Sequence, residues 1–117
     1  MTLADYTFKR NTIWCFNQPT KIMMHAVLVV FYSVFRRRRM VRFTSQGDGT
    51  HSPASKHYFF LALDVGARNI GLAKGLAMAR RIQTELDRVA RGIYYVVYEE
   101  HPAHFHLQVR RGNIKIE

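Results

Sequence analysis

The chain has 117 residues, the length of one domain, and 48% of them are hydrophobic, which excludes wholesale disorder. Eighteen Lys and Arg against eight Asp and Glu give a net charge of +10, which favours a polyanionic partner such as nucleic acid or an anionic membrane surface. Cys15 is the only cysteine, so the composition excludes an internal disulfide and a Cys-based zinc site and is typical of a reducing, intracellular compartment.

The first segment, 1–20, is mixed in pattern and carries the aromatic residues Trp14 and Phe16 before a proline. We expect it to be an N-terminal arm that packs on this domain or on a partner. Asp5 is the single acid among the first 44 residues, and acid-poor, Arg-bearing starts are typical of mitochondrial targeting segments. An intracellular, mitochondrial location is therefore expected.

A run of 14 residues, 22–35, carries no charge. It is too short for a transmembrane helix, which needs about 20 apolar residues, so we expect no membrane span. Its β-branched and aromatic side chains predict a buried strand. The extended pattern continues through 40–44, a turn is predicted at 46–49, and a third strand at about residues 57–63.

Apolar residues at spacings of three and four predict one long amphipathic helix. The expected stripe is Leu72, Leu76, Ala79, Ile82, Leu86 and Val89. Asn69 is expected to cap the start of this helix, and Gly92 to follow its last turn in a left-handed conformation. Gly75 inside the helix costs about 1 kcal/mol relative to Ala, which close packing on the sheet would explain.

The C-terminal segments complete the expected sheet. Residues 93–98 predict a fourth strand, 104–109 a fifth strand or a short helix, and 114–116 a last strand. The expected fold class is α+β, with a mixed sheet in the order β-β-β-α-β, a short element and a final strand, packed by one long helix. We expect two parts, the arm 1–20 and a basic α+β domain 21–117.

The acids and histidines give little support for catalysis. A nuclease-like cluster would consist of Asp48, Asp64 and Glu99. The chain contains no nucleophile elbow and no Gly-rich phosphate loop. His101, His104 and His106 could offer imidazoles to a metal, but no nearby Cys or acid completes the site. We expect no enzymatic activity, no cofactor, no metal and no small-molecule substrate.

Arginines carry the strongest functional signal. Five of them fall within seven residues and are flanked by aromatic residues rather than acids: Arg36, Arg37, Arg38, Arg39 and Arg42. Further basic groups on the helix and near the C-terminus supply Arg80, Arg81, Arg88, Arg110 and Arg111. Guanidinium forks match phosphate geometry, so basic groups on several elements predict an RNA-binding domain that contacts mainly backbone phosphates. The alternatives are a solvated charge run and a contact with anionic lipid.

The pattern resembles two related ribosomal families, universal protein eleven of the small subunit and protein eighteen of the large subunit. The small-subunit likeness rests on His25 before an apolar run, the turn 47–49, the small residues 52–55 before aromatics, and a Gly-hydrophobic step at Gly92. The large-subunit likeness rests on its Gly-x-x-x-Ala-x-Arg helix pattern. That pattern is matched by Gly75, Ala79 and Arg81.

This resemblance covers roughly residues 25–116. It implies a three-stranded antiparallel meander before the helix and a structural constituent of the ribosome that binds ribosomal RNA. It also implies neighbouring ribosomal proteins as partners, which we expect the N-terminal arm to contact.

Two other classes stay open. Residues 57–63 followed by 79–86 resemble the arm-type DNA-binding domain of tyrosine integrases, which implies sequence-specific DNA binding by a three-stranded sheet. The third class is a small subunit of a membrane complex, with 22–35 against lipid and the arginine run at the head groups.

Overall fold

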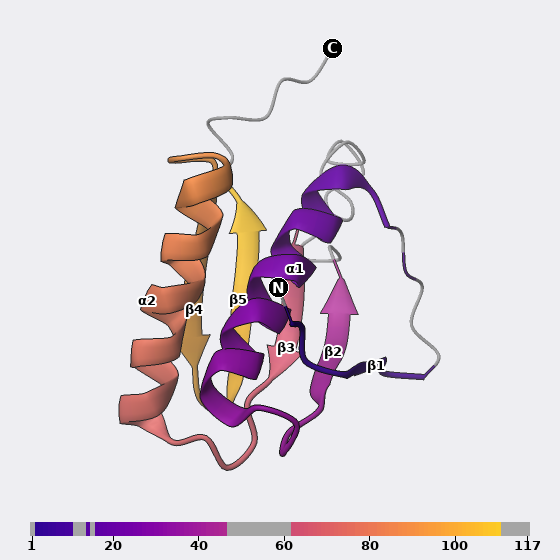
Figure 1. Ribbon diagram of the computed structural model, residues 1–117, viewed down its shortest axis with the longest axis vertical. Coiled ribbons are helices and arrows are strands. Elements are labelled where there is room, and N and C mark those ends of the chain that lie inside the picture. The colour runs from indigo at the N-terminus through magenta and orange to yellow at the C-terminus, as the bar shows by residue number, and fades with distance from the viewer. Residues whose placement is uncertain (1, 11–13, 15, 47–61, 111–117) are drawn as a thin grey trace.

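The computed structural model of the chain describes residues 2–10, 14, 16–46 and 62–110. Within these residues, five strands and two helices follow one another along the chain (Figure 1). They are β1 (Tyr6–Phe8), α1 (Gln18–Phe35), β2 (Val41–Gln46), β3 (Ala62–Gly66), α2 (Leu72–Val89), β4 (Tyr94–Glu99) and β5 (His104–Val109).

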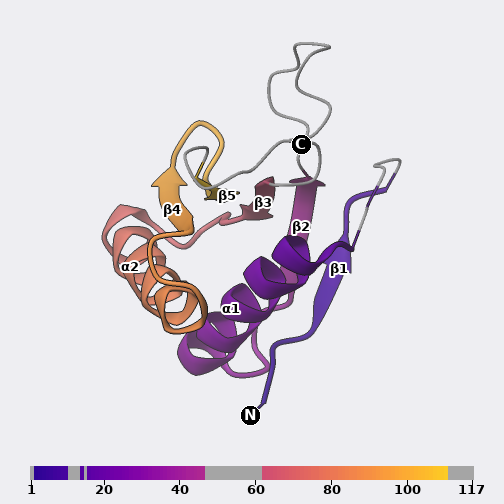
Figure 2. The same ribbon diagram turned by 90° about the horizontal axis from the view of Figure 1, so that it is seen from above.

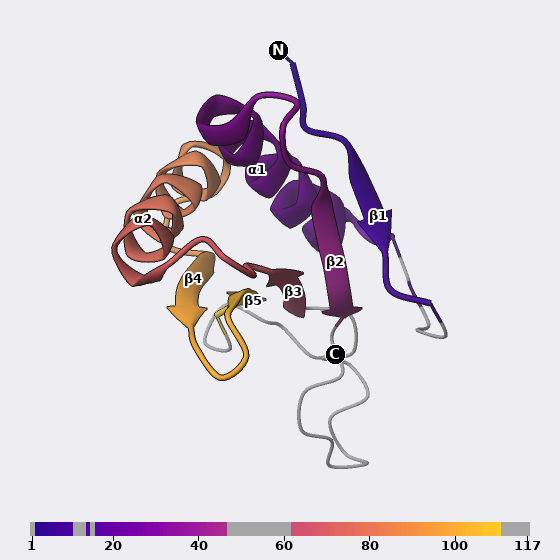
Figure 3. The same ribbon diagram turned by 90° about the horizontal axis from the view of Figure 1, so that it is seen from below.

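The strands form one mixed sheet in the order β1-β2-β3-β5-β4. β1 is parallel to β2, and the other neighbouring pairs are antiparallel. β3 and β4 both pair with β5 between them, so they are parallel to each other and α2 crosses over β5. Both helices lie on the same face of the sheet (Figure 2), and Figure 3 shows these two layers from the opposite end. The fold class is therefore α+β, with a mixed five-stranded sheet and two helices.

Residues 22–35 lie in α1, so the prediction of a strand there was wrong. The buried side chains of α1 cover a broad arc because the helix packs against both the sheet and α2. A helix buried on several sides loses the apolar periodicity of 3.6 residues, and its β-branched residues then resemble a strand. Its start carries clear signals, since the Asn17 side chain accepts a hydrogen bond from the Thr20 amide at 2.9 Å and Pro19 lies in the first turn.

α2 confirms the predicted long helix, and Ala79, Ile82 and Leu86 of the expected stripe are buried as predicted. Its buried residues are Gly75, Met78, Ala79, Ile82 and Leu86. Three residues of the expected stripe are exposed, namely Leu72, Leu76 and Val89. Asn69 is not the cap, because Gly71 occupies that position without a side-chain hydrogen bond and Asn69 lies in the preceding turn with φ of 66°.

The two glycines singled out in the sequence have the expected roles. A Cβ atom on Gly75 would lie 2.5 Å from the ring of Tyr98, so the glycine allows α2 to pack closely on β4. Gly92 has φ of 79°, the left-handed conformation predicted after the last helical turn.

Several predicted boundaries change. The arginine run 36–39 follows α1 as a turn instead of continuing a strand, and β2 begins at Val41. Residues 104–109 form a strand rather than a short helix, and β4 lies within one residue of its predicted position. The predicted turn 46–49, most of the third strand and the last strand 114–116 fall outside the described residues. The expected order β-β-β-α-β is replaced by β-α-β-β-α-β-β.

The expected arm is partly built into the sheet and helix layer. Tyr6–Phe8 pairs with β2, and the expected boundary at residue 20 falls inside the first turn of α1. Between the layers lie large, fully buried side chains, including Phe31, Phe43 and Phe105. A buried hydrogen bond of 2.7 Å from the Gln46 amide to the Thr20 hydroxyl ties the end of β2 to the start of α1.

Candidate nucleic-acid interface

The end of α1 fixes the backbone of the arginine run. Arg36 takes a positive φ of 56°, and its amide donates to the Tyr32 carbonyl at 2.8 Å. The amide and the Nε of Arg38 both donate to the Phe35 carbonyl, at 3.0 and 3.1 Å. These bonds satisfy carbonyls left open at the helix end, so the arginines lie in an ordered turn at one end of the helix layer.

Arg39 is held across three segments. Its Nη1 donates to the Arg68 carbonyl at 2.8 Å, and its guanidinium carbon lies 5.4 Å from the ring centroid of Phe35 and 6.0 Å from that of Phe31. The Lys74 ammonium lies 5.4 Å from the same Phe35 ring. One aromatic side chain at the end of α1 therefore gathers cations from the arginine turn and from α2.

Arg39 has a buried hydrogen-bond donor, its Nε, without an acceptor among the described residues. Burial also lowers the pKa of Arg39 from its ordinary value, although a guanidinium remains charged at neutral pH. Unpaired buried donors are uncommon in folded proteins and draw attention to a function.

We define the helix-end cluster as five cationic residues from three segments: Arg36, Arg38, Arg39, Arg68 and Lys74. Among the described residues, none of the five has a carboxylate within ion-pair distance. The neighbouring Arg37 has only a solvent-exposed contact of 3.9 Å to Asp5. Arg81 adds a further cation on α2, where its Nη2 donates to the Ser33 hydroxyl of α1.

The structure separates the other predicted phosphate-binding residues. Arg42 lies on the sheet face that the helices leave uncovered, and the guanidinium of Arg110 lies 5.7 Å from the Tyr95 ring on that face. Arg80 lies on the side of α2 that borders β4, and Arg88 pairs with Glu85 at 3.4 Å. Arg111 falls outside the described residues.

Sequence reasoning missed Arg68 and Lys74. Neither has another cation within five residues along the chain, and only the packing of α2 against the end of α1 brings them to the arginine turn. Recognising 22–35 as a helix would have pointed to Lys74, because a helix that ends at Phe35 places the Phe35 ring beside both the arginine turn and α2.

The uncovered sheet face carries a groove of about 500 Å³, which we call the open-face groove. Its charged and polar lining comprises Lys9, Arg42, Thr44, Ser45, Asp64 and His104. These residues come from β2, β3, β5 and the end of β1, and Gly66 forms part of the lining between them. Strand alternation places Arg42, Asp64 and His104 on this face, and a register shift between Phe43 and Ser45 in β2 brings the consecutive residues Thr44 and Ser45 to it together.

A chain of hydrogen bonds extends from this groove across the sheet. The Ser45 hydroxyl donates to Asp64 Oδ2 at 2.6 Å, and His106 Nδ1 lies 2.7 Å from Asp64 Oδ1. His106 Nε2 lies 3.0 Å from Gln108 Oε1, which also accepts from the Tyr95 hydroxyl at 2.9 Å. Both ring nitrogens of His106 therefore face oxygen acceptors, which favours the doubly protonated imidazolium.

The pair Asp64–His106 shifts both pKa values. The hydrogen bond to Asp64 raises the pKa of His106 against the opposing effect of burial. Burial alone would raise the pKa of Asp64, but the hydrogen bonds from His106 and Ser45 and the nearby imidazoles hold it below its usual value. The carboxylate thus serves an internal ion pair.

The metal and nuclease alternatives receive no supporting geometry. In the described part of the chain, no group of three or more His, Cys, Asp and Glu side chains is arranged to hold a metal ion. His104 and His106 share the uncovered face, but His104 lies beside Glu99 at 3.4 Å and beside the Pro102 carbonyl at 2.7 Å. Asp48, the third member of the conceivable acidic cluster, lies outside the described residues.

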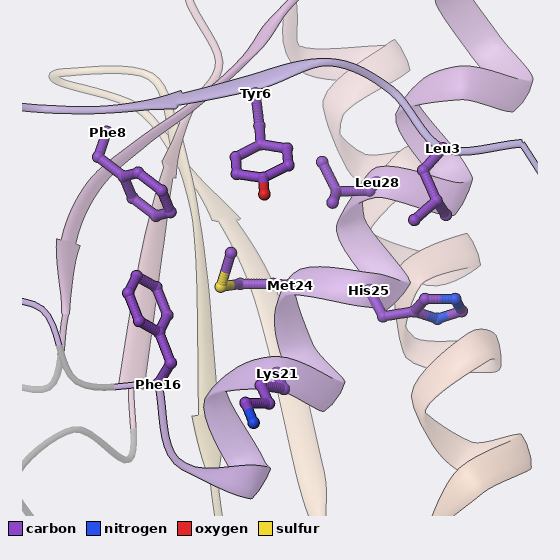
Figure 4. A pocket seen from close by; sticks show the side chains of 8 residues that line it. All are labelled: Leu3, Tyr6, Phe8, Phe16, Lys21, Met24, His25 and Leu28. Carbon is purple, nitrogen blue, oxygen red and sulfur yellow. The ribbon is translucent and has the colours of Figure 1, made fainter.

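A second hollow of about 460 Å³ lies between β1 and α1 and has a largely apolar lining (Figure 4). Tyr6 and Phe8 point from β1 towards Met24 and Leu28 of α1. The Phe8 ring also contacts Trp14, Phe16 and Phe43, at centroid distances of 4.8, 5.4 and 5.5 Å. Of the two expectations for these aromatics, packing on this domain is the one seen.

Comparison with protein-family models, with curated proteins and with solved structures found no match for the chain. Neither helix in the described part combines the length and the apolar character that a membrane crossing needs. The argument for function therefore rests on the helix-end cluster and the open-face groove.

Proposed function

We propose that the protein is a structural RNA-binding component of a ribonucleoprotein, and that the helix-end cluster is its main contact with backbone phosphates. The observation that carries the proposal is the gathering of five cations from three segments with no carboxylate at ion-pair distance among the described residues. Like charges held this close repel one another, and phosphate groups relieve that repulsion.

The geometry of Arg39 supports phosphate as the missing partner. Its guanidinium is fixed by the Arg68 carbonyl and the Phe35 ring, so little side-chain entropy remains to be lost on binding. Arg36 and Arg38 lie exposed beside it in a turn whose backbone is already fixed. The planar N–H fork of a guanidinium matches the paired oxygens of phosphate.

The spread of the remaining cations favours RNA that surrounds the protein over a single DNA groove. Arg42 and Arg110 lie on the uncovered sheet face, and Arg80 lies on the side of α2 that borders β4. A reader of one DNA groove concentrates its contacts on one element, whereas a protein embedded in folded RNA meets phosphates on several sides. Because of the family resemblance, we propose that the particle is a mitochondrial ribosome. Neighbouring proteins of that particle would contact the aromatic N-terminal region.

The packing of α1 removes the main support for the membrane alternative. That alternative places 22–35 against lipid, but Val27 and Phe31 are fully buried in the protein core. Sequence-specific DNA binding remains an outcome of the experiments that follow.

RNA affinity measured over a range of salt concentrations tests the cluster directly. We expect Arg36→Gln/Arg38→Gln to lower the slope of log affinity against log salt by about two, since each phosphate contact contributes roughly 0.9 to that slope in duplexes. The matched control is Lys21→Gln/Arg91→Gln, which removes the same charge from surfaces outside the cluster. An equal loss in both variants would show that net charge, and not this cluster, drives binding.

Fractionation of a native lysate tests the particle. We expect the protein to co-migrate with a ribosomal particle on a sucrose gradient and to leave it after ribonuclease treatment. A light position that ribonuclease does not change would contradict the proposal, and selection from random DNA would then test the DNA alternative.

A further inference from the structure

The open-face groove has a cationic wall on one side, a histidine on the other and a glycine between them. Lys9 and Arg42 stand on the β1–β2 side, and His104 stands on β5. Gly66 lies between them on β3 and pairs directly with His104 in the strand register. A Cβ atom at Gly66 would be in contact with the Thr44 side chain at 3.7 Å, so the glycine leaves open a part of the groove that a side chain would fill.

The groove is electrostatically suited to an anion. Lys9 and Arg42 are exposed, and neither has a carboxylate within ion-pair distance among the described residues. The carboxylate in the lining, that of Asp64, is already bound by the Ser45 hydroxyl and the His106 imidazole. Two cations therefore remain unbalanced at one wall.

The size and rings of the groove suit a single nucleotide better than a duplex. Its volume of about 500 Å³ is in the range of small-ligand sites, roughly 300–1,000 Å³. The His104 imidazole lines one wall, and the Tyr95 ring lies farther along the same face with Arg110 over it. Unpaired bases can enter such a site and stack on a ring, whereas the bases of a duplex are stacked inside it.

We infer that the open-face groove binds one unpaired nucleotide of an RNA strand, with its phosphate between Lys9 and Arg42 and its base against His104. This inference rests on the proposed RNA-binding function and names the part of the RNA that this face recognises. The helix-end cluster contacts phosphates of any RNA, and the groove adds a preference for unpaired positions. The Thr44 hydroxyl lines the groove where it can bond the sugar or the base edge.

A mononucleotide titration tests the groove apart from the cluster. We add 5′-AMP to the isotopically labelled full chain and follow backbone amide signals by NMR. The shifts are expected in 42–45, 64–66 and 102–106, to disappear in Lys9→Gln/Arg42→Gln, and to persist in Arg36→Gln/Arg38→Gln. No shifts in these segments, or shifts confined to the arginine turn 36–39, would overturn the inference.

A second experiment compares single-stranded RNA with a hairpin duplex of equal charge. Lys9→Gln/Arg42→Gln is expected to weaken single-strand binding about tenfold, because both side chains that hold the phosphate lose their charge. Duplex binding should stay nearly unchanged, because the bases of a duplex are stacked inside it and do not enter the groove. Arg36→Gln/Arg38→Gln is expected to weaken both. Both side chains of the groove variant are exposed, and circular dichroism verifies that it folds.

The two proposals fail in different ways. If the groove variant weakens single strands and duplexes equally, the groove inference is wrong while RNA binding stands. If the wild-type chain binds neither RNA but still shows the 5′-AMP shifts, RNA binding is wrong and the groove is a site for a free nucleotide.

Discussion

The two faces of the sheet are made by the same strands and have opposite chemistry. On β3, Leu63 and Val65 are fully buried under the helices, while Asp64 and Gly66 between and beside them face the open-face groove. On β5, Phe105 is buried while its neighbours His104 and His106 are half-exposed. The alternation of side chains along a strand produces this division.

The two faces contribute differently to the stability of the fold. The covered face holds the large apolar side chains, whose burial supplies most of the folding free energy. The open face holds ionic and hydrogen-bonding groups that are partly solvated and contribute less. Substitutions on the two faces should therefore give effects of different size and kind.

The largest effect is expected at Phe31, which is fully buried in α1 and meets the Phe105 ring at a centroid distance of 5.8 Å. Phe31→Ala removes apolar contacts and leaves a cavity, so the free energy of unfolding should fall by about 3–5 kcal/mol. Chemical denaturation measures the change. The open-face control is Val97→Ala, whose side chain is 38% exposed and should lose under about 1 kcal/mol. Equal losses at the two sites would break the comparison.

A smaller effect is expected at Gly75, where helix propensity and packing oppose each other. Alanine favours the helix by about 1 kcal/mol, but its Cβ would lie 2.5 Å from the Tyr98 ring. We expect the clash to dominate, with Gly75→Ala lowering the free energy of unfolding by about 1–3 kcal/mol. Adding Tyr98→Leu should recover part of this loss, and a stabilised single variant would contradict the packing argument.

Gln83 links the helix layer to the edge of the sheet. Its amide donates to the Tyr94 carbonyl at 2.9 Å and accepts from the Val96 amide at 3.0 Å, as a neighbouring strand would. Gln83→Ala leaves both groups of β4 without these partners and should lower the free energy of unfolding by about 1–2 kcal/mol. It should also promote self-association through the opened edge, measurable by sedimentation. Gln83→Glu keeps the acceptor and serves as the milder comparison.

The smallest effect is expected from the pair Asp64–His106 on the open face. The pKa of Asp64 is lower in the folded protein than in the unfolded chain. Its contribution to folding stability is therefore complete above the unfolded pKa, about 3.9, and is lost as pH falls through the folded pKa. The pKa of His106 is higher in the folded protein than in the unfolded chain. Its contribution to folding stability is therefore complete below the unfolded pKa, about 6.5, and is lost as pH rises through the folded pKa.

Stability from this pair should therefore peak between about pH 4 and 6.5, with an amplitude of about 1 kcal/mol because both groups are partly solvated. Unfolding measured across this range should show the maximum in the wild type and a flatter profile in Asp64→Asn. An unchanged pH profile in that variant would show that the ion pair contributes nothing.

The same contrast explains how much of the fold the sequence predicts. α2, β4 and β5 each have one buried side, so their apolar residues recur with the period of a helix or a strand. α1 is buried over a broad arc, and its uniform apolar run hides the helical period. β1 has three residues, too few for a period to be recognised.

The candidate site was predictable in part for a related reason. The arginine run is visible as a charge cluster without any structure. The contribution of Arg68 and Lys74 depends on the contact between α2 and the end of α1, which no local pattern encodes. The open-face groove likewise joins Lys9, Arg42 and His104, which are distant along the chain.

The position of β5 sets an order for synthesis. β5 follows β4 in the chain but lies between β3 and β4, so each of those strands has an unpaired side until residues 104–109 have left the ribosome. The segment through β2 already contains the arginine turn and the α1 that supports it. The arginine turn is therefore synthesised before its partners Arg68 and Lys74, and the sheet becomes continuous only when β5 is inserted between β3 and β4.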